Sequence, residues 1–162
     1  MKRLRITGLA ILVLVLAGCA DPMPEEMPAD FDFRLSYGVH GNKGMDTFRD
    51  VAVKDLVEDG SAEANVVLSE EEMETVYRQL AEINVIGDLD LVEKPRCQAS
   101  PSTLSTWQIV ANGETAEFAY GNDCGFEPRD VRKLRALELE IHDMVTSKEA
   151  YQALPEARGA YE

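Results

Sequence analysis

The segment from residue 31 to residue 37 alternates strictly between apolar and polar side chains. Phe31, Phe33, Leu35 and Tyr37 are aromatic or aliphatic, and the three residues between them are polar. Successive side chains of a strand point to opposite faces of its sheet, so this pattern predicts a half-buried strand. A chain that contains such a strand needs a sheet with one face on a core.

A hairpin is expected around Asn112-Gly113, the dipeptide favoured in two-residue turns. Folding about this turn places Trp107 opposite Phe118 on an apolar face. Gln108 then lies opposite Glu117 on a polar face. The apolar face is expected to meet the core, and the polar face is expected to point away from it.

Two helices are expected. Ser69-Glu70-Glu71-Glu72 has the spacing of a capping box, in which the serine and the third glutamate satisfy each other's backbone N–H groups. The helix that starts there should end near Asn84. A second helix should begin around Pro128. Their apolar positions recur at helical spacing: Met73, Val76, Tyr77, Leu80 and Ile83 in the first, and Val131, Leu134, Leu137, Ile141 and Met144/Val145 in the second.

The remaining pattern completes an α+β fold. Residues 38–44 are turn-rich, further strands are expected at 47–56 and 64–68, and residues 85–103 are irregular. The expected order is βββ-α-ββ-α, an antiparallel sheet of about five strands with two packing helices. Residues 31–162 are long enough for a single domain with its own core.

The first eighteen residues are typical of an export signal. Lys2, Arg3 and Arg5 precede an eight-residue apolar run from residue 9 to residue 16. Eight residues rise about 12 Å as a helix, whereas a bilayer core is about 30 Å thick. The run is therefore expected to be the core of a signal peptide and not a membrane-spanning helix.

Leu16-Ala17-Gly18-Cys19 resembles the lipobox of bacterial lipoproteins. The resemblance implies that Cys19 is acylated, with chains such as palmitate, and becomes the mature N-terminus in the cell envelope. Ala20 after the cysteine implies the periplasmic side of the outer membrane in a Gram-negative cell. In a Gram-positive cell the anchor would lie on the extracellular face of the cell membrane. An ordinary signal peptide that ends near a cysteine is the alternative.

The segment after Cys19 is predicted to be a tether. Residues 20–30 contain three prolines and four acidic residues, which disfavour a helix or a central strand and favour a stiff, solvated spacer. Cleavage before Cys19 removes three basic residues and no acid, so the formal charge changes from −14 to −17. This acidity argues against nucleic acid as a partner, because nucleic-acid binding rewards clustered cations.

Cys97 and Cys124 remain as an even pair once Cys19 carries lipid. In an oxidising compartment such a pair is expected to form a disulfide, which would contribute roughly 3–4 kcal/mol by closing a loop. A redox-active or metal-binding pair is the alternative, although the sequence has no Cys-x-x-Cys motif and no histidine near either cysteine.

The sequence has no recognised catalytic or cofactor-binding motif. The two histidines, His40 and His142, are not at metal-ligand spacing, and there is no Gly-x-Ser-x-Gly. We therefore predict no catalytic residues, metal or cofactor, although His40 in its glycine-rich loop is a weak candidate. A basic group that could meet a polyanion or pair within its own helix is Arg129, Arg132, Lys133 and Arg135.

The element order, the Ser-Glu-Glu-Glu-Met helix start and the closing Leu-Pro…Gly-x-Tyr resemble small secreted or lipid-anchored bacterial proteins that have no assigned activity. The sequence therefore favours a non-catalytic binding domain in the cell envelope, whose partner is an envelope protein or a cell-wall component. The alternative is a small envelope hydrolase with carboxylate chemistry near residues 85–103, a long loop of the kind that often carries a site.

Overall fold

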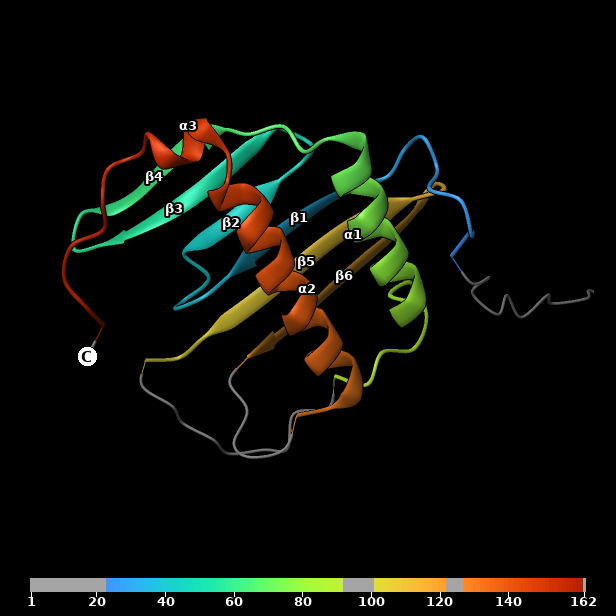
Figure 1. The fold of residues 1–162 in the computed structure, drawn as a ribbon. Coiled ribbons are helices and arrows are strands. Elements are labelled where there is room, and N and C mark those ends of the chain that lie inside the picture. Colours follow the sequence, from blue (N-terminus) through green and yellow to red (C-terminus); the bar gives the residue numbers. More distant parts are fainter. Residues whose placement is uncertain (1–22, 92–100, 122–126, 162) are drawn as a thin grey trace, which may run out of the picture.

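Six antiparallel strands form one sheet at the centre of the described chain, which in this computed structural model comprises residues 23–91, 101–121 and 127–161. The order across the sheet is β4-β3-β2-β1-β5-β6 (Figure 1). The strands are β1 Asp32–Tyr37, β2 Lys43–Asp46, β3 Val51–Val57, β4 Gly60–Asn65, β5 Leu104–Ala111 and β6 Glu114–Gly121.

The helices lie over one face of this sheet (Figure 1). They are α1 Glu70–Ile83, α2 Arg129–Thr146 and the short α3 Glu149–Gln152. The α+β class expected from the sequence is confirmed. In the described part of the chain, no helix combines the length and hydropathy needed to cross a bilayer.

Strand β1 divides its residues between the two faces as its alternation requires. Phe33, Leu35 and Tyr37 are buried, whereas Arg34 is exposed and Ser36 is half-buried. The buried side meets the apolar stripes of both long helices, and an aromatic contact between Phe31 and Tyr77 of α1 links the two layers. The largest fully buried side chains include Trp107, Tyr77, Phe33, Leu35, Met45, Leu80, Ile109, Leu134, Leu137 and Ile141.

The hairpin between β5 and β6 has the expected register. Trp107 pairs with Phe118, and Gln108 pairs with Glu117. Asn112 and the glycine that follows it have φ values of 54° and 77°, the left-handed conformation that a two-residue turn of this kind needs.

Helix α1 begins and ends as expected. The Ser69 hydroxyl accepts a hydrogen bond from the Glu72 N–H at 3.2 Å, and the Glu72 carboxylate accepts one from the Ser69 N–H at 2.7 Å. Asn84 caps the other end with φ of 61°. The Glu72 carboxylate also binds the Lys148 ammonium at 2.7 Å, which ties the start of α1 to the end of α2.

The expected count of five strands and two helices is wrong in detail. Residues 47–50 form a turn between β2 and β3, where one strand over 47–56 was expected. Strand β2 has only four residues, one of them Gly44, so its pattern is too short to read from the sequence. The third strand was expected over 64–68, but β4 runs from Gly60 to Asn65. Pro128 is the N-cap of α2 and precedes its first turn.

The end of the tether is docked on the domain, where a solvated spacer was expected. Met23 is only 8% exposed, and the Tyr77 hydroxyl donates a hydrogen bond to the Pro24 carbonyl at 2.7 Å. The Asp30 carboxylate accepts hydrogen bonds from the Asn112 and Gly113 N–H groups, at 2.8 and 2.7 Å. Residues 23–30 therefore form a strap across α1 and the hairpin turn.

The C-terminal segment makes ordered contacts with the sheet. It adds the unexpected helix α3, with Tyr151 buried, and Arg158 then forms a parallel bridge to Val57. The final contact is made by the Tyr161 hydroxyl, which donates to the Asp55 carboxylate at 2.8 Å. These contacts hold the C-terminal segment against β3.

We expect Ser69→Ala to lower the free energy of unfolding by about 1 kcal/mol, because the substitution leaves the Glu72 N–H without its capping acceptor. Urea denaturation measures the change. Ser61→Ala, at another exposed serine outside a cap, is the matched control. An equal effect of both substitutions would contradict the capping account.

Candidate functional site

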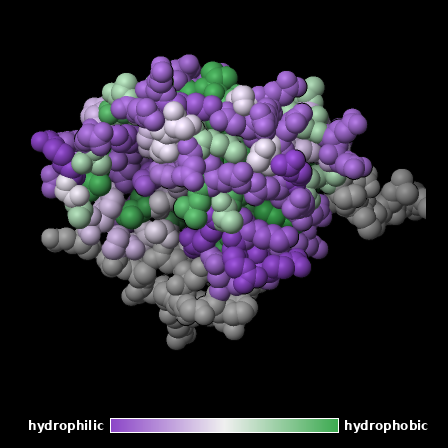
Figure 2. Space-filling view, in the orientation of Figure 1, coloured by the Kyte–Doolittle hydropathy of each residue, from purple (hydrophilic) through white to green (hydrophobic). Residues whose placement is uncertain are grey.

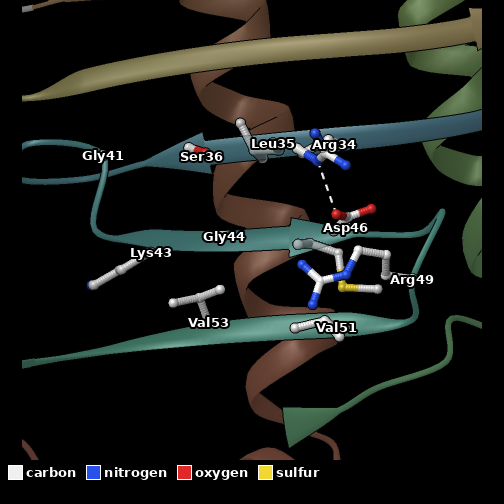
Figure 3. A pocket seen from close by; sticks show the side chains of 11 residues that line it. Arg34, Leu35, Ser36, Gly41, Lys43, Gly44, Asp46, Arg49, Val51 and Val53 are labelled. Atoms are coloured by element: carbon white, nitrogen blue, oxygen red, sulfur yellow. Dashed lines mark hydrogen bonds and ion pairs between the residues drawn. The ribbon is translucent and has the colours of Figure 1, made fainter. Parts of the chain in front are cut away.

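The face of the sheet opposite the helices carries two adjoining hollows. We call this the open face; it bears Arg34 and Ser36 of β1, and α1 and α2 lie behind it in Figure 3. The first hollow measures about 310 Å³ and lies over β1, β2 and β3. The second measures about 200 Å³, lies over β1, β5 and β6, and shares Arg34 and Ser36 with the first.

A bare stretch of β2 forms the floor of the first hollow. Gly44 pairs with Ser36 across the strands, so only a hydrogen atom and a hydroxymethyl group rise from these two positions. A Cβ on Gly44 would lie 2.9 Å from the Leu35 carbonyl oxygen, which is closer than real Cβ atoms approach. The close approach of β1 and β2 therefore requires glycine here and keeps the hollow open.

An ion pair lies where the two hollows meet. The Arg34 Nε donates to Asp46 Oδ2 at 2.8 Å (Figure 3), and the two residues are register partners. Their side chains are 48% and 11% exposed, so the carboxylate is buried while the guanidinium reaches solvent. The Phe48 ring lies 5.8 Å from the Arg34 guanidinium carbon. Asp46 Oδ1 is shielded from solvent and accepts no hydrogen bond from a described residue.

Arg49 supplies a second cation from the 47–50 turn. Its side chain extends back between β2 and β3 (Figure 3) and is 60% exposed. The guanidinium nitrogen Nη2 is 4.0 Å from the Glu63 carboxylate, a distance typical of a loose surface pair. Val51 and Val53, both half-buried, form the apolar wall beside it.

Besides Arg34, the second hollow is lined by neutral and acidic groups. Gln108 Nε2 donates to the Glu117 carboxylate at 3.1 Å, and Thr106 pairs with Ser36 in the next row. Since Gln108 is also the partner of Arg34, a row of polar side chains runs from Glu117 through Gln108 and Arg34 to Asp46. This row crosses four strands and joins the two hollows.

Sequence reasoning placed Gln108 and Glu117 on a polar face but missed the site. The residues that make it, above all Arg34 and Asp46, come from strands whose pairing is not encoded locally. Two features of the sequence could have indicated the site: the polar residues Arg34 and Ser36 that alternate with the apolar ones in β1, and Gly44 in the following segment.

A carboxyl group with a raised pKa, that of Glu138, lies on the helix side of the sheet. Burial between β6 and α2 raises the pKa of Glu138, which accepts a hydrogen bond from the Tyr120 hydroxyl. That hydroxyl in turn accepts one from Trp107 Nε1 at 3.1 Å, and burial raises the pKa of Tyr120 as well. These groups satisfy one another inside the core, so we assign them a structural role.

The two histidines lie in different settings. His40 has φ of 53° in the loop after β1, and its Nδ1 is 3.4 Å from the exposed Ser102 hydroxyl. His142 is half-buried at the boundary of the core, with Nδ1 2.8 Å from the Tyr37 hydroxyl. Among the described residues, no three His, Cys, Asp or Glu side chains converge as metal ligands.

Two members of the basic group on α2 pair with nearby carboxylates. The Arg129 guanidinium binds Asp130 at 3.1 Å, and the Arg135 guanidinium pairs with Glu127. The Asp130 carboxylate also accepts a hydrogen bond from the Asp90 N–H at 3.0 Å, so it joins α2 to the segment after α1. The pKa of Asp130 is lowered because these hydrogen bonds outweigh the effect of burial.

Several predicted site residues lie outside the described residues. These are Cys19, Cys97 and Cys124, and with them residues 92–100 of the 85–103 loop. No family model matches the sequence, and no curated protein matches it either. The open-face geometry is thus the main basis for a functional proposal.

We expect the free energy of unfolding to fall as the pH drops through about 6.5, in part because of His142. Burial is the main cause that lowers the pKa of His142 below its ordinary value of 6.5, and the nearby Lys43 adds to it. The unfolded chain therefore takes up a proton at a pH where the folded protein does not, which favours unfolding.

Urea denaturation at about pH 8 and about pH 5.5 measures this loss of stability. His142→Gln should lose less stability over that interval than the wild-type protein. Tyr37→Phe, which removes the hydrogen bond and keeps the ring in place, should retain the wild-type loss because burial dominates. Identical pH profiles for wild type and His142→Gln would contradict this assignment.

Proposed function

We propose that the protein is a non-catalytic binding domain of the bacterial cell envelope, anchored through acylated Cys19, and that it binds its partner on the open face. The observation that supports this proposal most is the one-sided sheet. Helices cover one face, while the other presents two joined hollows with paired and unpaired polar groups.

The helix side offers less to a partner. Figure 2, drawn in the orientation of Figure 1, shows a mostly hydrophilic surface on which hydrophobic residues are scattered. Single exposed apolar residues such as Leu139 are normal on soluble domains, whereas binding surfaces gather their groups. The open face gathers them, with Phe48, Val51 and Val53 beside the Arg34–Asp46 pair.

The lining of both hollows is suited to binding. Among the described residues it brings together the Arg34 guanidinium, the Asp46 and Glu117 carboxylates and the Gln108 amide. Arginine, carboxylate and amide side chains in such an arrangement orient a ligand by hydrogen bonds.

The strap limits the distance between the domain and the membrane to which Cys19 would anchor it. Met23 is docked in the core, and three residues lie between it and Cys19. The four residue steps from Cys19 to Met23 span at most about 14 Å when fully extended. An acylated Cys19 would therefore hold the α1 side of the domain close to the lipid surface. In that oxidising compartment we also propose a disulfide between Cys97 and Cys124.

The test is position-specific photocrosslinking in the protein's own envelope. A benzophenone amino acid at Thr106, exposed on the open face, should give a crosslinked adduct when irradiated. The same group at Arg132, exposed on α2, is the matched control and should give none. Adducts from position 132 alone would contradict the assignment of the open face.

Two further variants sharpen this experiment. Ser36→Tyr places a bulky ring between the two hollows and should abolish the adduct from position 106. Cys19→Ser should move the protein from the membrane fraction to the soluble fraction and leave the precursor unprocessed. If Cys19→Ser leaves fractionation unchanged, the lipid anchor is wrong even where the open face still crosslinks.

A further inference from the structure

We propose that the two hollows bind a neutral, hydroxyl-rich chain, the chemistry of an oligosaccharide. This inference rests on the proposed function, because it names the ligand class of the same open face. It follows from the hydrogen-bonding character of the site, from its charge, and from its extent across the sheet.

The open face presents groups that only donate hydrogen bonds next to groups that only accept them. Arg34 and Arg49 can only donate hydrogen bonds, whereas the ionised carboxylates of Asp46 and Glu117 can only accept them. A hydroxyl group does both. Neighbouring hydroxyls on one ligand can therefore donate to a carboxylate and accept from the guanidinium beside it, which no purely anionic or cationic group achieves.

Charges of both signs line the site. Over the two hollows the lining holds three cations, Arg34, Lys43 and Arg49, and two carboxylates, those of Asp46 and Glu117. The cations repel a cationic ligand, whereas the carboxylates and the formal charge of −14 on the whole protein repel an anionic one. A neutral ligand avoids both repulsions and still meets the donors and the acceptors.

The buried carboxylate oxygen strengthens the case for a ligand that donates. Asp46 Oδ1 accepts no hydrogen bond from a described residue, and an unmet acceptor of this kind is costly. Arg34 holds the other oxygen, so the carboxylate is fixed in place. Phe48 lies beside Arg34, and Arg49 extends from the same turn toward β2 and β3 (Figure 3). Because Oδ1 is shielded, a ligand hydroxyl reaches it only when a neighbouring side chain moves aside.

The shape of the site suits a chain and not an isolated small molecule. The hollows share Arg34 and Ser36, and together they extend from β3 to β6. Four strand spacings amount to about 19 Å. Val51 and Val53 offer an apolar wall on which the C–H face of a sugar ring can pack, while the polar row meets its hydroxyls.

Backbone-amide NMR titration of the purified residue 19–162 protein, prepared with Cys19→Ser, tests the proposal. The probes are four neutral tetrasaccharides: chitotetraose, cellotetraose, maltotetraose and mannotetraose. We expect at least one to shift the amides of Ser36, Gly44 and Thr106 saturably. Tetragalacturonate, which is anionic, and fully deacetylated chitotetraose, which is cationic, should bind at least about tenfold more weakly.

Arg49→Ala should weaken binding of the active tetrasaccharide about tenfold or more, the loss expected for a hydrogen bond to a charged group. Arg132→Ala, another exposed arginine outside both hollows, should bind as the wild type does. Thermal denaturation confirms that both variants are folded. Equal affinity of the two variants would contradict the site, even if a tetrasaccharide binds.

Failure of this inference can be told apart from failure of the proposed function. If no neutral tetrasaccharide binds, or if tetragalacturonate binds more tightly, the saccharide class is wrong. Photocrosslinking from Thr106 in the envelope would then still support binding on the open face. If position 106 also gives no adduct, both proposals are wrong.

Discussion

The pleat of β1 is the constraint on which the rest of the structure depends. This strand lies between β2 and β5 at the middle of the sheet, so its two sets of side chains define both faces. Phe33 and Leu35 make one face of the sheet apolar, and α1 and α2 cover that face. Burial of aromatic and aliphatic groups there lowers the free energy of the folded state most. Arg34 and Ser36 then point to the opposite face by the period of the strand alone.

That division couples stability to function. The same register that buries Leu35 opposite Met45 sets Arg34 opposite Asp46, so the ion pair and the core cannot be changed independently. A slip of one residue would exchange the faces and destroy both. Gly44 adds a second coupling, because the close approach of β1 and β2 excludes a side chain at the point where the hollow needs open space.

Local patterns predicted the elements whose partners are close in sequence. The Asn112-Gly113 turn fixes the hairpin register, and the reciprocal Ser69–Glu72 bonds fix the start of α1. The site was not predictable in this way, because Arg34 meets Asp46 twelve residues on and meets Gln108 from a distant strand. The docking of the strap was not predictable from its composition, because a Pro/Glu-rich segment is usually solvated. In the structure Met23 nevertheless enters the core, and the Asp30 carboxylate accepts a hydrogen bond from the distant hairpin turn.

The central claim is that the open face is occupied in the envelope, and carbene or hydroxyl-radical footprinting of Phe48 measures this most directly. Phe48 is 41% exposed beside Arg34, and Leu139, 67% exposed on α2, serves as the internal reference. We predict that Phe48 is labelled less in the native envelope than in the purified protein, while labelling of Leu139 stays the same. Equal labelling of Phe48 in both settings, or protection of Leu139 alone, would contradict the account.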